Sequence, residues 1–128
     1  MVRRFDLAID CAHPAALARF WAEALGYPAP DADPADDEDV VLEPPEAGAH
    51  VVYFQRVPEG KVAKKRIHLD LAVGGDGPIE ARRARIDAEA ARLVALGASD
   101  HRGAIEEGGN YWIRMNDPEG NEFCLVSG

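Results

Sequence analysis

The chain repeats one pattern of apolar and polar residues, and this repeat is the feature that most constrains its fold. Shifting the sequence by 62 residues lays Phe5-Asp6-Leu7 over Ile67-His68-Leu69. Each copy begins with an alternating stretch typical of a half-buried strand, at 3–10 and at 66–71. An apolar helical stripe follows in each copy, and both stripes end in Ala-Leu-Gly.

Further strands are expected after each helix. They lie at 40–43 and 50–57 in the first copy and near 99–105, 111–115 and 122–126 in the second. The sequence therefore predicts one domain over 1–128, built from two β-α-β-β-β modules at about 1–60 and 61–128. Because one module alone leaves a sheet face bare, we expect an α+β fold with a curved, mostly antiparallel sheet and the helices on its outer face.

The charge distribution limits the partners that this chain can have. The 128 residues include 23 acidic and 14 basic side chains, a net charge of −9 with neutral histidines. Residues 20–55 contain nine acids and no Lys or Arg, and we interpret the acidic run within them as a solvated loop. A chain this acidic, with no basic stripe, repels phosphate backbones, so no nucleic-acid partner is expected.

Two further features indicate a cytoplasmic protein with no membrane partner. No apolar run approaches the ~20 residues of a transmembrane helix, and Asp6 lies where a signal peptide would be apolar.

Cys11 and Cys124 are too few for a disulfide framework or a zinc cluster. We expect two reduced, mostly buried thiols, and a disulfide between them stays an open alternative.

The sheet face opposite the helices collects ionisable side chains. On the first strand of each copy and on the last strand, alternation gives that face Asp6, Ala8, Asp10, His68, Asp70, Glu122, Cys124 and Val126. Trp112 and Arg114 form one alternating set of the strand at 111–115. On the strand at 50–57, either Tyr53 and Gln55 or Phe54 and Arg56 join the face, and periodicity does not choose. A polar concave face suits a small-molecule site, although one face of many antiparallel sheets simply meets solvent.

Three stretches resemble the vicinal oxygen chelate superfamily, which includes glyoxalase, bleomycin-resistance and extradiol-dioxygenase proteins. They are Asp10-Cys11-Ala12-His13-Pro14 through Phe20-Trp21 to Ala24-Leu25-Gly26-Tyr27, then His68-Leu69-Asp70-Leu71, and finally Asp117-Pro118-Glu119-Gly120-Asn121-Glu122-Phe123. The resemblance spans nearly the whole chain. It implies paired modules that form a cup, and a homodimer.

Enzymes of that superfamily hold a divalent metal with one side chain from the first and last strand of each module. The matching positions here are Asp6, Tyr53 (or Gln55 if the register slips), His68 and Cys124. The sequence departs from the family pattern of His, Gln and Glu, because Cys124 stands where a glutamate is expected. A hard ion such as Mg²⁺ prefers oxygen ligands, whereas Asp6, His68 and Cys124 together suit zinc. We therefore expect no metal, with that trio as its ligands if one binds.

Three functions are compatible with these residues. The favoured one is small-molecule binding without a metal, through Asp6, Tyr53, Gln55, Asp70, Trp112, Arg114 and Cys124. The overall acidity favours a cationic ligand. The first alternative is a metal-dependent lyase or isomerase of glyoxalase type, in which His68 and Glu122 move protons. The second is a regulatory domain whose cup contacts another protein.

Overall fold

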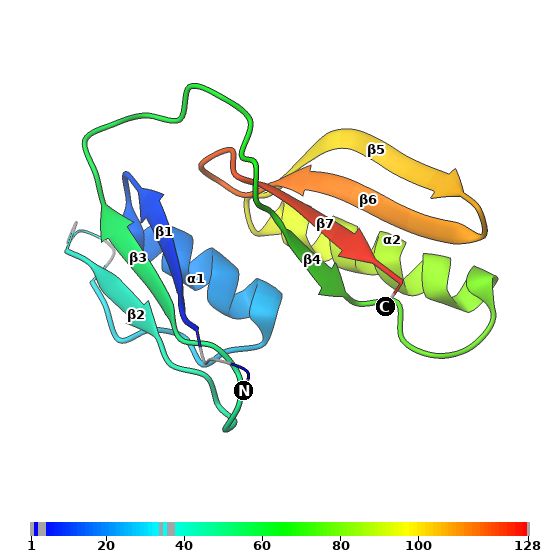
Figure 1. Cartoon of the computed structure of the whole chain (residues 1–128), viewed down its shortest axis with the longest axis horizontal. Helices are drawn as coiled ribbons and strands as arrows, with labels where there is room; N and C mark the ends of the chain where they lie inside the picture. The colour runs from blue at the N-terminus through cyan, green and yellow to red at the C-terminus, as the bar shows by residue number, and fades with distance from the viewer. Residues whose placement is uncertain (1, 3–4, 34, 36–37, 128) are drawn as a thin grey trace. The chain divides into compact units, whose positions relative to one another are not determined.

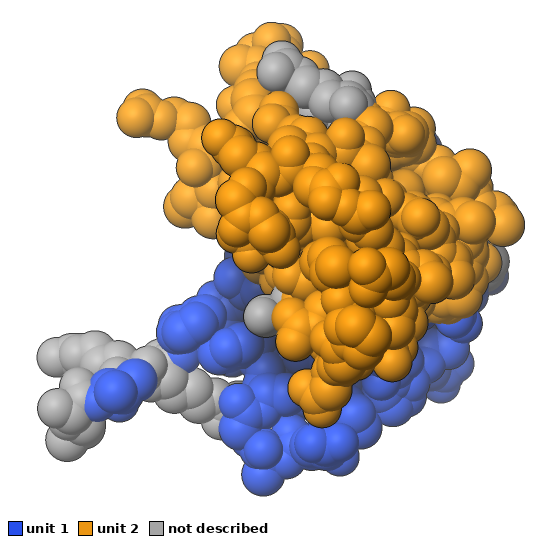
Figure 2. Space-filling model, turned by 90° about the vertical axis from the view of Figure 1, so that its right-hand side faces the viewer, with its two compact units in different colours: residues 1–60 blue, residues 61–128 orange. Residues whose placement is uncertain are grey.

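The computed structural model describes residues 2, 5–33, 35 and 38–127, which form two compact units. Unit 1 is Met1–Gly60 and unit 2 is Lys61–Gly128, coloured separately in Figure 2. Each unit packs one helix on one face of its own sheet (Figure 1). The predicted α+β class is confirmed. Among the described residues, no helix has both the length and the apolar character needed to cross a bilayer.

Unit 1 is built from three described strands and one helix. These are β1 (Leu7–Cys11), α1 (Pro14–Leu25), β2 (Val40–Leu42) and β3 (Val52–Arg56). The strand order is β1-β3-β2, with β1 parallel and β2 antiparallel to β3. The described residues of 28–39 contain no strand, in agreement with the loop expected there.

The ends and the buried face of α1 follow from its sequence. Pro14 takes the first helical position, where its missing N–H costs no hydrogen bond, and Gly26 ends the helix in the left-handed conformation at φ 73°. Leu17, Phe20 and Trp21 are buried on the sheet side of the helix. Because these residues fall three and four positions apart, they form one apolar stripe against β2 and β3.

Unit 2 carries the larger sheet. Its elements are β4 (Leu69–Ala72), α2 (Ile79–Ala95), β5 (Ser99–Glu107), β6 (Asn110–Asn116) and β7 (Glu122–Val126). The strand order is β4-β7-β6-β5, in which β4 is parallel to β7 and the other pairs are antiparallel. One face of this sheet packs against α2 through its two central strands (Figure 1).

The apolar core of unit 2 fixes which side chains face away from α2. Its fully buried members are Ile86 and Leu93 of α2, Met115 of β6, and Phe123 and Leu125 of β7. Successive side chains of a strand point to opposite faces, so the residues between these core positions lie on the other side of the sheet. That open face carries Trp112, Arg114, Glu122, Cys124 and Val126.

The turn between β6 and β7 is held by one buried carboxylate. Asp117 is 2% exposed, and its Oδ1 accepts hydrogen bonds from the backbone N–H groups of Glu119 and Asn121, both at 2.9 Å. Its Oδ2 accepts a third from Asn121 Nδ2, also at 2.9 Å. Gly120 adopts φ 85°, which favours glycine. The Asp-Pro-Glu-Gly-Asn segment therefore sets the register of the antiparallel pair.

The first strand of each unit begins later than the sequence predicts. Residues 3–4 lie outside the described residues, and β1 starts at Leu7, while β4 starts at Leu69 rather than at residue 66. Phe5 and Ile67, which alternation assigns to the core, are 56% and 85% exposed. Pairing explains the difference, since the register of β1 with β3 begins at Leu7 and that of β4 with β7 at Leu69.

Candidate functional site

Three polar side chains form a row across the open face of the unit 2 sheet. Asp70 of β4 pairs with Cys124 of β7, and Cys124 pairs in turn with Arg114 of β6. The next row on the same face pairs Trp112 with Val126. Since neighbouring strands lie ~5 Å apart, these two rows place a polar strip beside an apolar one.

A pocket of about 290 Å³ lies over these two rows. Its lining residues all belong to unit 2, and they are Lys64, His68, Asp70, Trp112, Arg114, Glu122, Phe123, Cys124 and Val126. Trp112 and Val126 supply its apolar wall. An indole face beside a few convergent polar groups is typical of a small-molecule site.

Each carboxylate of the pocket already has a partner. Asp70 Oδ1 lies 3.0 Å from His68 Nδ1. Glu122 Oε1 lies 2.8 Å from Lys61 Nζ, and its Oε2 accepts a hydrogen bond of 3.1 Å from the backbone N–H of Lys65. Both carboxylates of the pocket are thus engaged by residues of unit 2.

Glu122 is held ionised by these contacts. Burial alone would raise its pKa, but the hydrogen bonds from Lys61 and from backbone N–H groups lower the pKa to about 2. A carboxylate with this pKa is a weak base at neutral pH, which is unfavourable for the predicted catalytic role. Its contacts instead tie the 61–65 segment to the first residue of β7.

The thiol of Cys124 stays protonated near neutral pH. Burial is the main cause that raises its pKa, and the charge of Asp70 and a hydrogen bond to it add to the effect. Arg114 and Lys64 act in the opposite direction without reversing the shift. Cys124 is therefore a small neutral group on the pocket floor.

Arg114 is the pocket cation for which the described residues offer no partner. In the described part of the protein, its guanidinium forms no hydrogen bond and no ion pair. The other cation that lines the pocket, Lys64, lies 3.4 Å from the backbone oxygen of Lys65. Arg114 consequently offers a planar set of donors to whatever enters the pocket.

The residues of unit 2 also allow the family's metal to be tested against the donors present. One ligand atom from each of His68, Asp70 and Cys124 lies within 4.8 Å of the other two. A single carboxylate does not match the oxygen-rich shell of Mg²⁺ or Mn²⁺. A nitrogen, an oxygen and a sulfur donor suit zinc, provided that the Cys124 thiol loses its proton.

The remaining predicted site residues belong to unit 1. Asp6 is exposed and precedes β1. The structure also answers the register question for β3, because Val52 and Phe54 are buried while Tyr53 and Gln55 are exposed. The structure thus brings the predicted site residues of unit 2 together in one pocket. Asp6, Tyr53 and Gln55 belong to unit 1.

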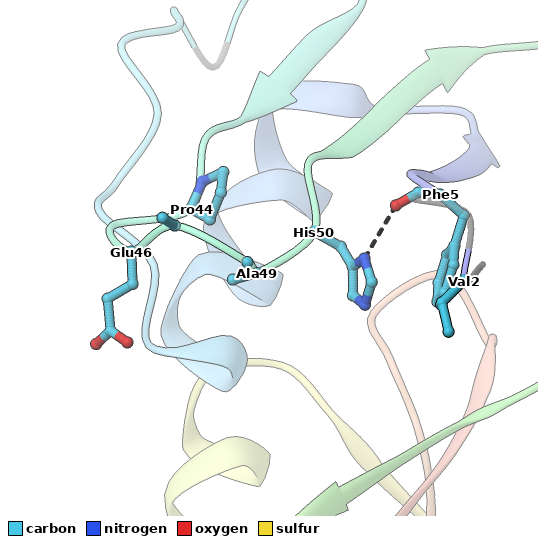
Figure 3. Close-up of a pocket in the computed structure, with 8 residues that line it drawn as sticks. Val2, Phe5, Pro44, Glu46, Ala49 and His50 are labelled. Atoms are coloured by element: carbon cyan, nitrogen blue, oxygen red, sulfur yellow. Dashed lines mark hydrogen bonds between the residues drawn. The ribbon is translucent and has the colours of Figure 1, made fainter.

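Unit 1 has a larger pocket that the sequence does not predict. Its volume is about 500 Å³, and its lining includes Val2, Phe5, Pro44 and His50. The rings of Phe5 and His50 stack with centroids 4.1 Å apart, and His50 Nδ1 lies 2.9 Å from the backbone oxygen of Phe5 (Figure 3). The carboxylate of Glu46 points away from this ring pair in Figure 3. Among its described lining residues, fewer charged and polar side chains converge than in the pocket of unit 2.

The lysines of unit 2 are the site residues that sequence reasoning missed. Lys61 and Lys65 bind Glu122, and Lys64 lines the pocket. The Lys-Val-Ala-Lys-Lys-Arg run at the start of the second module was the available signal. This run is basic, whereas the half of the chain before it is acidic.

Together, the fold and the pocket define an α+β protein with a candidate small-molecule site on one sheet face. The model of the glyoxalase-like domain matches residues 6–126. The chain therefore belongs to the glyoxalase-like domain family, and the predicted superfamily is confirmed. Comparison with curated proteins found no match.

Several solved structures share the fold. The hypothetical protein SA1046 from S. aureus has a TM-score of 0.71 at 14% identity, covering 100% of this chain and 95% of that chain. A glyoxalase/bleomycin resistance protein/dioxygenase family enzyme from Burkholderia phytofirmans PsJN has a TM-score of 0.68 at 18% identity, with 94% of each chain covered. The fosfomycin resistance protein FosX from Mesorhizobium loti has a TM-score of 0.69 at 14% identity, covering 100% and 94%. At these identities the similarity establishes the fold alone.

Proposed function

We propose that this protein binds a small molecule in the unit 2 pocket and that binding requires no metal. The observation that carries the proposal is the pair of rows on β4, β7 and β6. There an apolar wall lies beside Arg114, whose guanidinium forms no hydrogen bond or ion pair with any residue that the structure describes. The carboxylates that could serve a hard metal are already engaged by His68 and Lys61. Cys124 is protonated, which disfavours its use as a ligand.

A fragment screen on metal-free protein tests this proposal. Amide chemical shifts would be followed by NMR as each fragment is added, after metal has been removed on a chelating resin. Binding should move the signals of β6 and β7 and the indole N–H of Trp112. Trp112→Ala should weaken binding about tenfold or more, because the aromatic wall is lost. Phe5→Ala, which alters the unit 1 pocket, is the matched control and should change nothing.

The second candidate is a zinc-dependent lyase or isomerase of glyoxalase type. The observation that favours it is the donor cluster of His68, Asp70 and Cys124, whose ligand atoms lie within 4.8 Å of one another. Bound zinc would supply a Lewis acid that polarises a substrate oxygen. In that case Arg114 and Trp112 would orient the substrate, and the protonation of Cys124 would oppose metal binding at low pH.

Zinc titration separates this candidate from the first. If it holds, zinc should bind near one equivalent and raise the melting temperature, and both effects should be lost in His68→Ala and in Cys124→Ser. A matched control is His13→Ala, which changes a histidine of unit 1. A protein that takes up no zinc, or takes it up equally in all variants, contradicts the second candidate.

We also propose that the protein is a homodimer, as the family resemblance implies. Light scattering coupled to size-exclusion chromatography measures this directly. A mass near twice 13.8 kDa is expected, and a mass of one chain at all concentrations contradicts it.

A further inference from the structure

We infer that the ligand of the unit 2 pocket carries an anionic group, a carboxylate, that binds Arg114. This inference rests on the proposed function, since it names the class of molecule that the same pocket takes. It differs from the expectation of a cationic ligand, which the net charge of the whole chain suggests.

The acidity of the chain belongs almost wholly to unit 1. Residues 1–60 carry twelve acidic and four basic side chains, whereas residues 61–128 carry eleven acidic and ten basic ones. Unit 2 is therefore close to neutral. Because exposed charges more than ~10 Å apart are largely screened at 0.1 M salt, the groups that line a pocket decide its ligand more than the distant ones do.

Within the pocket, both carboxylates have a close partner, whereas the guanidinium of Arg114 has none among the described residues. Asp70 lies against His68 at 3.0 Å, and Glu122 lies against Lys61 at 2.8 Å. Arg114 has no such partner among the described residues, and Lys64 lines the same pocket. An incoming anion would therefore gain Arg114 as an ion-pair partner, while an incoming cation would find both carboxylates already engaged by other side chains.

The geometry of Arg114 specifies the kind of anion. Its planar guanidinium presents two parallel N–H donors, which match the two oxygens of a carboxylate. Trp112 lies two residues away on the same face, and Val126 pairs with it across the strands. A carboxylate attached to a flat apolar group would thus place its charge on Arg114 and its ring on the indole. A pocket of about 290 Å³ is in the size range of such a molecule.

Three probes of one shape and different charge test the inference. They are 2-naphthoate, 2-naphthamide and 2-naphthylmethylammonium, each titrated into metal-free protein while the NMR signals of unit 2 are followed. We expect 2-naphthoate to bind about tenfold more tightly than the amide, and the ammonium compound to bind most weakly. Added salt should weaken only the binding of 2-naphthoate.

Variants assign the effect to one side chain. Arg114→Gln should reduce the affinity for 2-naphthoate about tenfold and leave that for 2-naphthamide unchanged, while Arg114→Lys should lose less. Arg92→Gln removes the same charge from α2, where Arg92 pairs with Glu89, and serves as the matched control. Unchanged amide spectra outside the pocket show that each variant is folded.

The outcomes separate this inference from the function on which it rests. If the amide or the ammonium compound binds the pocket as tightly as 2-naphthoate, or if Arg114→Gln has no effect, the carboxylate inference is wrong and small-molecule binding stands. If none of the probes and no fragment perturbs the pocket, both are contradicted.

Discussion

Asp70 of β4 lies directly across from Cys124 of β7, and its carboxylate adds to burial in keeping the Cys124 thiol protonated. Arg114 of β6 completes the same row, and its guanidinium forms no hydrogen bond or ion pair with any residue that the structure describes. The family's fold thus presents a pocket whose chemistry differs from the metal set expected of its enzymes.

Neutralising Asp70 should make Cys124 more reactive. Asp70→Asn removes the negative charge beside the thiol, so the pKa of Cys124 should fall and the thiolate fraction at pH 8 should rise. We expect alkylation by iodoacetamide to be about three- to tenfold faster, measured on the Cys124 peptide by mass spectrometry so that Cys11 does not interfere. Asp76→Asn, a change outside the pocket lining, should have no effect. An equal or slower rate in Asp70→Asn would show that its charge does not act on the thiol.

Glu122 should stabilise the folded protein at neutral pH. Its pKa of about 2 lies below the value of 4.5 expected in the unfolded chain, so the ionised form favours folding. Its side chain is 10% exposed, and we expect Glu122→Gln to lower the free energy of unfolding by about 1 kcal/mol at pH 7.

This contribution has a defined pH dependence. Because the folded-state pKa is depressed, the stabilisation is present above about 4.5 and is lost as the pH falls towards about 2. Urea unfolding of wild type and Glu122→Gln between pH 7 and pH 2 should therefore converge. The matched control, Glu107→Gln, changes an exposed glutamate at the end of β5 and should track wild type throughout. A difference that grows towards low pH would contradict the assignment.

Asp117 should be the residue of the β6–β7 turn that matters most for stability. Asp117→Ala leaves two backbone N–H groups and one side-chain amide without their acceptor in a buried turn. We expect a loss of about 2–4 kcal/mol in the free energy of unfolding, measured by urea denaturation. Asp76→Ala provides the exposed comparison, with an expected change within about 0.5 kcal/mol. Equal effects of the two substitutions would mean that the turn does not depend on its carboxylate.

Most of what could be predicted from the sequence came from the periodicity of its apolar residues. The alternation in Glu122-Phe123-Cys124-Leu125-Val126 is enough to separate a core face from an open face, since a strand has a period of two. The repeat and the Ala-Leu-Gly endings located both helices. The family could be predicted because its motifs reflect local geometry, such as the turn built on Asp117.

Other features depend on contacts that no local pattern records. The ion pair of Lys61 with Glu122 joins residues 61 positions apart, and it helps to lower the pKa of Glu122, which makes this carboxylate a weaker base. The start of each first strand depends on where its partner strand begins. The face of Tyr53 could not be chosen because both alternating sets of its strand contain aromatic and apolar residues.

The central claim is that the unit 2 pocket binds its ligand without a metal. Calorimetry with the tightest fragment of the screen tests it most directly, with one titration into metal-free protein and one after addition of one equivalent of zinc. If binding requires no metal, we expect the same dissociation constant in both titrations and a loss of binding in Trp112→Ala. Binding that appears only after zinc is added, and that disappears in His68→Ala, would contradict it.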